Sequence, residues 1–353
     1  MTTIHDVAKH AGVSIATVSN VINNNAKVSA GTAERVRQAI NDLNYIPNIA
    51  AKGLKTNVTR IIGVLMEDIR NFASPYIIDG ICQQCENDGY HVNVDNLQVN
   101  RRADYNVDDT YGQLAKSGDF QTSVREALKT LLSARICGLI YLGTHPRDVS
   151  GLLPPLNIPV VYAYCYAEKP ASSKALNISY DDYQGAQLAV KNIIRAGHTK
   201  IAIIGGLINS YATHRRMMGY QTALMEYALP LYPEYILSGN WSYESGHELA
   251  GKLFNLPNPP TAVFVMNDLM AFGVIDSLKG MGIRVPDDVS VHGFDDLLAS
   301  RYFSPPLSTI SLPLHEIGEK AAGSVIKMAE NGNEASGDKF ILIPCRHVPR
   351  ASV

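Results

Sequence analysis

Two short helical patterns separated by a glycine open the chain and limit its possible folds more than any other segment. Apolar residues recur at helical spacing from Ile4 to Ala11, and Gly12 follows as a typical helix stop. A second pattern runs from Ser14, a preferred N-cap residue, to Ile22. This arrangement predicts a helix-turn-helix, a motif whose second helix enters the major groove of DNA.

A third helix is predicted from Ala30 to Leu43, with Ser29 as its cap. The alternative is a small three-helix bundle without a ligand, but the second helix carries polar residues of the kinds that reach phosphates and base edges. Charge favours DNA weakly: residues 1–58 carry a balance of +3, whereas the remainder of the 353 residues carries −5.

Four sequence motifs resemble those of the lactose/galactose repressor (LacI/GalR) family. They are T-I-x-D-V-A (3–8), A-G-V-S-x-x-T-V-S (11–19), V-S-x-x-T (28–32) and Y-x-P-N (45–48). The resemblance continues almost to the C-terminus. It implies a DNA-binding transcriptional regulator with a periplasmic-binding-protein-like core, and the residue roles below are expectations on that basis.

The start of the second helix is expected to read DNA bases. Val18 must face the first helix, which leaves Ile15, Ala16 and Asn20 for base edges, as the resemblance also implies. Asn20 suits a bidentate contact with adenine, and the two apolar residues suit thymine methyl groups. Phosphate contacts are expected from Ser14, Thr17, Ser19, Asn23, Ser29, Thr32 and Tyr45, which would fix the register of the protein on DNA.

Residues 47–58 follow the predicted domain 1–46 and match the family's hinge helix. There, Leu54 stands where the family inserts a leucine into the minor groove, at a cost of a few kcal/mol of unstacking. A flexible linker is the alternative, because so short a helix is marginal in isolation. Gly53 weakens this helix by about 1 kcal/mol relative to alanine.

From residue 59 the pattern changes to short apolar runs alternating with helical stretches, which predicts parallel doubly wound sheets. The runs are too numerous for one sheet, so the fold class is an all-α head followed by an α/β core of two lobes. Residues 59–350 form the expected core. Its first lobe is predicted over about 59–163 and 311–333, and its second over about 164–310 and 334–350.

Polar residues follow several strands of the predicted sheets, where ligands of such folds bind. Arg216, Asn267, Asp295 and Trp241 match the family's effector-contacting positions. Carboxylate and amide groups bind hydroxyls in pairs and a Trp ring stacks on the apolar face of a sugar, so a sugar-like effector is expected. Trp241 as a core residue stays open, and Asp268 and Asp296 could each cap a helix instead.

Three departures from the family affect the expected pocket. Ala73 and Ser74 stand where relatives carry bulky aromatics, and Tyr164 stands where lactose-type repressors carry Asp. All three are predicted to line the effector site. The segment 95–121 is longer than the family norm and forms either a surface excursion or a lid.

The sequence therefore predicts a cytoplasmic repressor of a carbohydrate-utilisation operon, which is a homodimer on a pseudo-palindromic DNA operator. The alternative is the same regulator with a nucleoside or purine effector, and a remote one is a solute-binding protein without DNA function. No enzyme, cofactor, metal or membrane motif is present. The five cysteines lack zinc-ligand spacing, so free thiols are expected.

Overall fold

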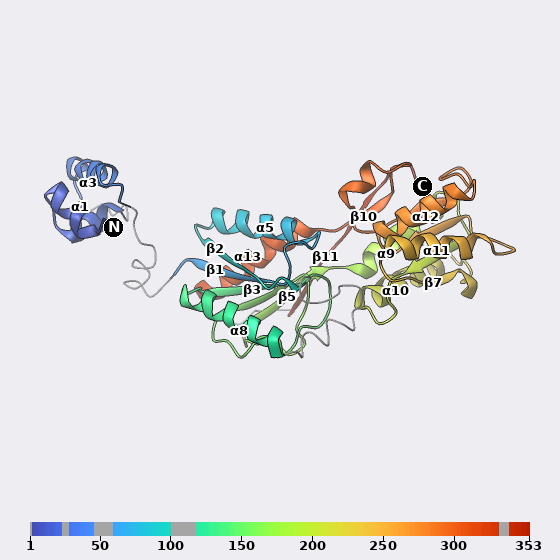
Figure 1. Ribbon diagram of the computed structural model, residues 1–353, viewed down its shortest axis with the longest axis horizontal. Helices are drawn as coiled ribbons and strands as arrows, with labels where there is room; N and C mark the ends of the chain where they lie inside the picture. Colours follow the sequence, from blue (N-terminus) through green and yellow to red (C-terminus); the bar gives the residue numbers. More distant parts are fainter. Residues whose placement is uncertain (1, 23–27, 46–58, 100–117, 332–338) are drawn as a thin grey trace. The chain divides into compact units, whose positions relative to one another are not determined.

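The computed structural model describes residues 2–22, 28–45, 59–99, 118–331 and 339–353 (Figure 1). The chain divides into two compact units, Met1–Thr59 and Arg60–Val353, and each is described by itself. The predicted hinge residues 47–58 lie outside the described part, as does most of the long segment 95–121. Within the described residues, no helix is long and apolar enough to span a membrane.

The first unit contains the three predicted helices, α1 (Ile4–Ala11), α2 (Ile15–Ile22) and α3 (Ala30–Asp42). Thr3 begins α1 in a capping box with Asp6, and Gly12 ends it with a left-handed φ of 63°. The Ser14 hydroxyl accepts from the backbone N–H of Thr17 at 3.1 Å, as an N-cap does. The helix-turn-helix prediction is confirmed.

The three helices pack around a small apolar core. Val7, Val18 and Val36 are completely buried, one from each helix. Val18 therefore faces inward as predicted, which turns the opposite face of α2 outward. With so few large side chains, this unit has a small hydrophobic contribution to its stability.

The second unit begins with a six-stranded parallel sheet in the order β11-β5-β4-β3-β1-β2. Side chains alternate between its two faces, so α5 and α13 cover one face and α8 packs against strands on the other (Figure 1). The elements of this first lobe are β1 (Ile61–Met66), α5 (Ser74–Asn87), β2 (His91–Asn96), α8 (Gly118–Ser133), β3 (Gly138–Leu142), β4 (Val160–Ala163), β5 (Ala175–Tyr180), α13 (Leu314–Asn331) and β11 (Phe340–Ile343).

The second lobe contains a four-stranded parallel sheet in the order β7-β6-β8-β9 and an antiparallel pair, β10-β12. Helices α9 and α10 pack together, as do α11 and α12. Its elements are α9 (Asp182–Arg195), β6 (Ile201–Gly205), α10 (Tyr211–Glu226), η1 (Pro233–Tyr235), β7 (Ile236–Ser238), α11 (Tyr243–Phe254), β8 (Ala262–Val265), α12 (Asp268–Gly280), β9 (Ser290–His292), η2 (Leu298–Arg301), β10 (Thr309–Ser311) and β12 (Arg346–Val348).

The predicted fold class of two doubly wound lobes is confirmed, but the predicted division between the lobes is wrong in two places. Strands β5 and β11 belong to the first sheet, whereas the prediction assigned both to the second lobe. β5 pairs with β4, and β11 pairs with β5. The chain therefore passes between the lobes near residues 181, 312 and 345. The polar Asn177 and Ser179 interrupt the apolar pattern of β5, which is why the sequence did not reveal this strand.

Helices α5 and α13 approach closely at two glycines. A Cβ atom on Gly80 would lie 2.1 Å from the carbonyl oxygen of His315, and one on Gly318 would lie 2.1 Å from that of Ile77. Both obstacles are backbone atoms, which cannot rotate away. The close spacing of the two helices therefore requires glycine, which has no side chain, at both positions.

Gly318→Ala should reduce the free energy of unfolding by about 2 kcal/mol, because overpacking at this contact exceeds the gain of about 1 kcal/mol in helix propensity. Gly323→Ala is the matched control on the same helix, since its Cβ would meet nothing closer than 3.9 Å. The control should be neutral or stabilising in urea denaturation. Equal effects of the two substitutions would contradict the close packing.

Candidate functional sites: the inter-lobe cleft and the N-terminal helices

A cavity of about 500 Å³ lies between the two lobes of the second unit. It is situated at the carboxyl ends of parallel strands of both sheets, where α/β proteins bind ligands. From the first lobe it is lined by Asn71, Phe72, Thr144, His145, Pro146, Tyr164 and Tyr180; from the second by Leu207, Ser210, Ala212, Arg216, Asn240, Trp241, Ser242, Tyr243, Glu244, Asn267, Leu269 and Asp295. Of the seven predicted effector residues, five line this cleft.

Arg216 makes several hydrogen bonds at the cleft. It is only 3% exposed, and its Nε donates to Asp182 Oδ1 at 2.7 Å. Nη2 donates to the Tyr180 hydroxyl at 2.9 Å, and Nη1 donates to the backbone oxygen of Met266. Its guanidinium also lies over the Phe294 ring at 3.7 Å. Tyr180 ends β5 of the first lobe, so Arg216 joins both lobes as well as facing the cleft.

Asp182 and Tyr180, the partners of Arg216, are not among the residues predicted from the sequence. Asp182 is buried at the start of α9, where burial raises the pKa of its carboxyl and the Arg216 guanidinium opposes that rise. The pair Asp181-Asp182 directly follows β5 and could have indicated the site. The sequence pattern did not reveal β5, however, so the pair was not recognised as following a strand. Asp181, the N-cap of α9, accepts from the backbone N–H of Gln184 and leaves Asp182 for Arg216.

Asn267 both caps a helix and holds Trp241. Its Oδ1 accepts from the backbone N–H of Met270 at 2.9 Å, and its Nδ2 donates to the backbone oxygen of Trp241 at 2.9 Å. Trp241 has a φ of 72°, which few L-residues adopt. Its ring packs so closely on Gly206 that a Cβ there would lie 2.0 Å from it. Trp241 therefore has both roles that were left open for it: it is half-buried against the core, and it lines the cavity.

Asp295 brings a carboxyl group to the cleft from the loop after β9. One of its oxygens lies 3.8 Å from Arg216 Nη2, beyond hydrogen-bonding distance, and its side chain is 12% exposed. Burial raises its pKa well above the ordinary value, and the guanidinium opposes this shift. Tyr164 lies on the facing lobe and stacks at a tilt on Tyr180, with ring centroids 5.5 Å apart.

The prediction that Ala73 and Ser74 line the site is wrong. Both are buried at the start of α5, and the Ser74 hydroxyl donates to the backbone oxygen of Asp68. The turn before α5 instead presents Asn71 and Phe72 to the cleft. Ala73 and Ser74 therefore lie beneath the surface and do not line the cavity.

Asp268 and Asp296 lie near the cleft without lining it. Asp268 is the first residue of α12, whose cap is Asn267, and it accepts three hydrogen bonds from other segments. Asp296 accepts from Arg350 at 2.6 Å. Neither carboxylate is a helix cap, so that alternative is wrong for both.

In the first unit, the expected base-reading residues lie on the outward side of α2. Ile15 is 40% exposed, Ala16 is exposed and Asn20 is half-buried. An exposed apolar Ile is the kind of residue that meets a thymine methyl group. The base-reading role of Ile15, Ala16 and Asn20 stays a prediction.

The expected phosphate contacts fall into three groups. Ser14 and Thr17 share a hydroxyl contact of 2.9 Å at the start of α2, and Ser19 follows on the same helix. Ser29 precedes α3 and bonds to the Thr32 hydroxyl at 3.0 Å instead of to the helix backbone. Tyr45 packs partly against the core of this unit. Asn23 and Leu54 lie outside the described residues.

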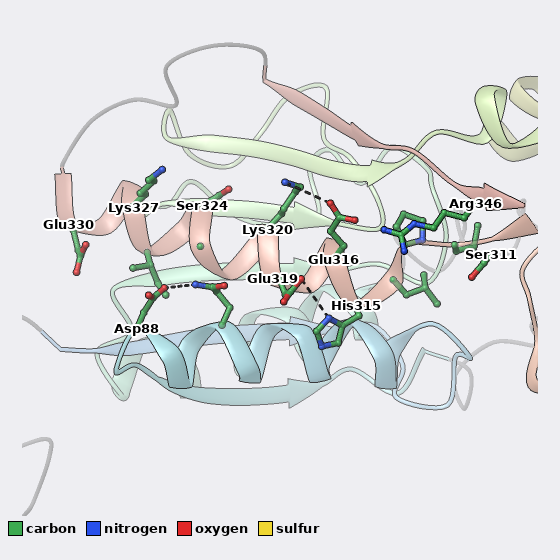
Figure 2. Close-up of a pocket in the computed structure, with 16 residues that line it drawn as sticks. Asp88, Ser311, His315, Glu316, Glu319, Lys320, Ser324, Lys327, Glu330 and Arg346 are labelled. Atoms are coloured by element: carbon green, nitrogen blue, oxygen red, sulfur yellow. Dashed lines mark hydrogen bonds and ion pairs between the residues drawn. The ribbon is translucent and has the colours of Figure 1, made fainter.

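A second, more open cavity of about 1050 Å³ lies along α5 and α13, as Figure 2 shows. Two pairs of its titratable side chains lie close together: Lys320 lies 3.9 Å from Glu316, and His315 lies 3.6 Å from Glu319. Gln84 donates to Asp88 in the same groove. This is a solvated polar surface, and among the described residues no cluster with the composition of a metal site is present.

Comparison with known proteins gives a family match in each of the two units. Residues 3–48 match the family model "Bacterial regulatory proteins, lacI family", and residues 190–353 match a periplasmic binding protein-like domain. The chain is 35% identical to the HTH-type transcriptional repressor PurR of Vibrio parahaemolyticus over 326 residues, covering 91% of this chain and 90% of that protein. It is 33% identical to PurR of Haemophilus influenzae over 339 residues, covering 95% and 93%.

The chain belongs to the LacI family of bacterial regulatory proteins. A crystal structure of the Lac repressor dimer bound to operator and the anti-inducer ONPF has the same fold, with a TM-score of 0.77, 27% identity and coverage of 99% of this chain and 98% of that one. The prediction of a DNA-binding LacI-family transcriptional repressor is confirmed at this level. Its relatives are repressors and not enzymes.

Arg216→Met in this LacI-family chain should lower the free energy of unfolding by about 3–5 kcal/mol, because it leaves buried carboxyls without their cation. Arg215→Met is the matched control: its side chain is 30% exposed and lies 3.8 Å from Asp181, so the loss should stay below about 1 kcal/mol. Urea denaturation measures both.

The pH dependence of Arg216→Met gives a further check. Without the guanidinium, the raised pKa of Asp182 rises further, so the folded state binds a proton that the unfolded state releases. The stability deficit relative to wild type should therefore shrink as the pH is lowered toward the ordinary carboxyl range. A deficit that does not change with pH, or that equals the deficit of Arg215→Met, would contradict the buried ion pair.

Proposed function

We propose that this chain represses transcription from a pseudo-palindromic operator as a homodimer, and that a purine base or nucleoside in the inter-lobe cleft sets its affinity for DNA. The supporting observation is the similarity to PurR repressors along nine-tenths of both chains, which favours the purine alternative over the sugar that the sequence first suggested. The carbohydrate-utilisation operon is accordingly not part of this proposal.

The chemistry of the cleft is compatible with a planar heterocycle. Tyr164, Tyr180, Trp241, Phe72 and Tyr243 supply aromatic side chains from both lobes. Aromatic rings bind flat ligands by offset stacking. At the edge of such a ring, polar atoms of Asn267 and Asp295 could exchange hydrogen bonds with ring nitrogens and exocyclic groups, as in other small-molecule sites.

A sugar effector is the second candidate. Arg216, Asn267, Asp295 and Trp241 lie around one cavity, and carboxylate, amide and indole groups together also suit a hydroxylated ring. A Lac repressor structure bound to ONPG, 28% identical to this chain with a TM-score of 0.77, supports this candidate. The two candidates differ in ligand and not in mechanism.

On the DNA side, Ile15, Ala16 and Asn20 are proposed to contact bases, and the hydroxyl residues at both helix starts are proposed to contact phosphates. Ligand binding in the cleft changes the equilibrium between lobe arrangements by its differential affinity for them. Since the chain passes between the lobes three times, a movement at the cleft reaches the first lobe through covalent connections.

Guanine, hypoxanthine or a purine nucleoside should raise the melting temperature and alter the emission of Trp241, the chain's single tryptophan. At 100 times the Kd, the stabilisation should be about 2.7 kcal/mol. Uracil and galactose serve as controls in the same differential scanning and fluorescence titrations. A response to galactose and none to any purine would reverse the choice between the two candidates.

Asn20→Ala should relax the preference for one base in each half-site, with a loss of discrimination of about 1–3 kcal/mol. Gln38→Ala is the control, because Gln38 is an exposed residue of α3 and not of α2, and it should keep the wild-type preference. Selection of operators from a random DNA library, followed by gel-shift titration, gives both results. Identical selected sequences for Asn20→Ala and wild type would remove Asn20 from base readout.

A further inference from the structure

We infer that Asp268 is a positioning residue that fixes the Asp295 loop in the cleft and ties this loop to β10, the strand by which the chain returns to the first lobe. The inference deepens the proposed function, on which its ligand measurement rests. Asp268 is not a cleft residue and would not contact the ligand.

The carboxylate of Asp268 accepts three hydrogen bonds from two segments, the turn 297–300 and the strand β10. One oxygen, Oδ2, accepts from the backbone N–H of Leu297 at 2.9 Å and from the Ser300 hydroxyl at 2.6 Å. The other, Oδ1, accepts from the Thr309 hydroxyl of β10 at 2.6 Å. The residue is completely buried, so water does not substitute for these partners. A fully satisfied buried carboxylate of this kind rigidifies the segments it joins.

The loop that Asp268 holds has an unusual backbone. Asp295 and Asp296 have φ values of 118° and 57°, a conformation that costs free energy for residues other than glycine. Gly293 lies so close that a Cβ there would be 2.3 Å from Asp268 Oδ1. Contacts from outside must therefore keep the loop in place, and those to Asp268 are among the shortest.

The same loop pairs directly with the returning strand. The backbone N–H of Asp295 donates to the oxygen of Ile310 at 2.9 Å. Beyond Ser311 the chain enters α13, which packs on α5 and on four strands of the first sheet. A ligand that pulls on Asp295 therefore acts on β10 and through it on the first lobe. Asp268 bonds both partners and keeps them moving together.

The arrangement requires a carboxylate. All three donors need acceptors, and Asn would provide one oxygen while pointing an NH₂ group at other donors. Burial raises the pKa of Asp268 to about 6, although its hydrogen bonds oppose the rise. The charged groups around it are Asp296, which accepts from Arg350, and Asp295, which lies beside Arg216.

Asp268→Asn and Asp276→Asn in the full-length protein separate this role from general loss of stability. Asp276 is on the same helix and also accepts a hydrogen bond of 2.6 Å, from the Tyr243 hydroxyl. Without ligand, amide hydrogen exchange in residues 294–301 and 308–311 should be at least tenfold faster in Asp268→Asn, and unchanged in Asp276→Asn. Equal exchange in the two variants, or no change in the first, would overturn the inference.

The ligand measurement uses guanine, followed by the emission of Trp241. Asp268→Asn should bind guanine at least tenfold more weakly. Asp288→Asn, whose exposed carboxylate accepts from Arg284 outside the cleft, should bind it within twofold of wild type. Guanine affinity of the wild type should also fall between pH 7 and pH 5 as Asp268 is protonated, a dependence that is weakened in Asp268→Asn. Wild-type affinity for guanine in Asp268→Asn would overturn the inference. If guanine does not bind the wild type, the proposed function fails, and hydrogen exchange alone decides the role of Asp268.

Discussion

The buried guanidinium of Arg216 is the interaction on which the rest of the cleft depends. It bonds Asp182 at the start of α9, the Tyr180 hydroxyl of the first sheet and the backbone after β8, and it lies over Phe294. Such a cation is stable in the interior only because its partners neutralise it and accept its N–H groups. The two lobes therefore share one electrostatic centre, located where a ligand would enter.

Around that centre, hydrogen bonds to neighbouring residues fix the polar side chains of the cleft in place. Asn267 is fixed by its cap to α12 and by its bond to Trp241, and Asp295 is fixed by the loop that Asp268 anchors. Preorganised groups bind a ligand with less entropic cost. The same connections run into β10 and α13, so a site built this way is also one that can transmit the presence of a ligand to the first lobe.

Much of the fold was predictable because local rules decided it. Gly12 ends α1 and Val18 faces inward, as helix-stop and helical-spacing rules require. The division between the lobes was not predictable in this way, because β5 and β11 join the first sheet by long-range pairing. Such pairing leaves little trace in the local sequence pattern. In the cleft, residues directly after apolar strands were found, whereas Asp182 was hidden behind the unrecognised β5. Ala73 and Ser74 were misplaced because a turn of one or two residues decides which side chains face the cavity.

Reciprocity between ligand and DNA is the decisive test of allosteric control from the cleft. Operator affinity is measured by gel shift with and without saturating guanine, and guanine affinity is measured by Trp241 emission with and without saturating operator. If both equilibria bias one conformational change, each ligand must alter the affinity of the other by the same factor, typically about 5–150-fold. Equal factors in this range are expected. Operator affinity that does not respond to bound guanine would contradict allosteric control from this cleft by a purine.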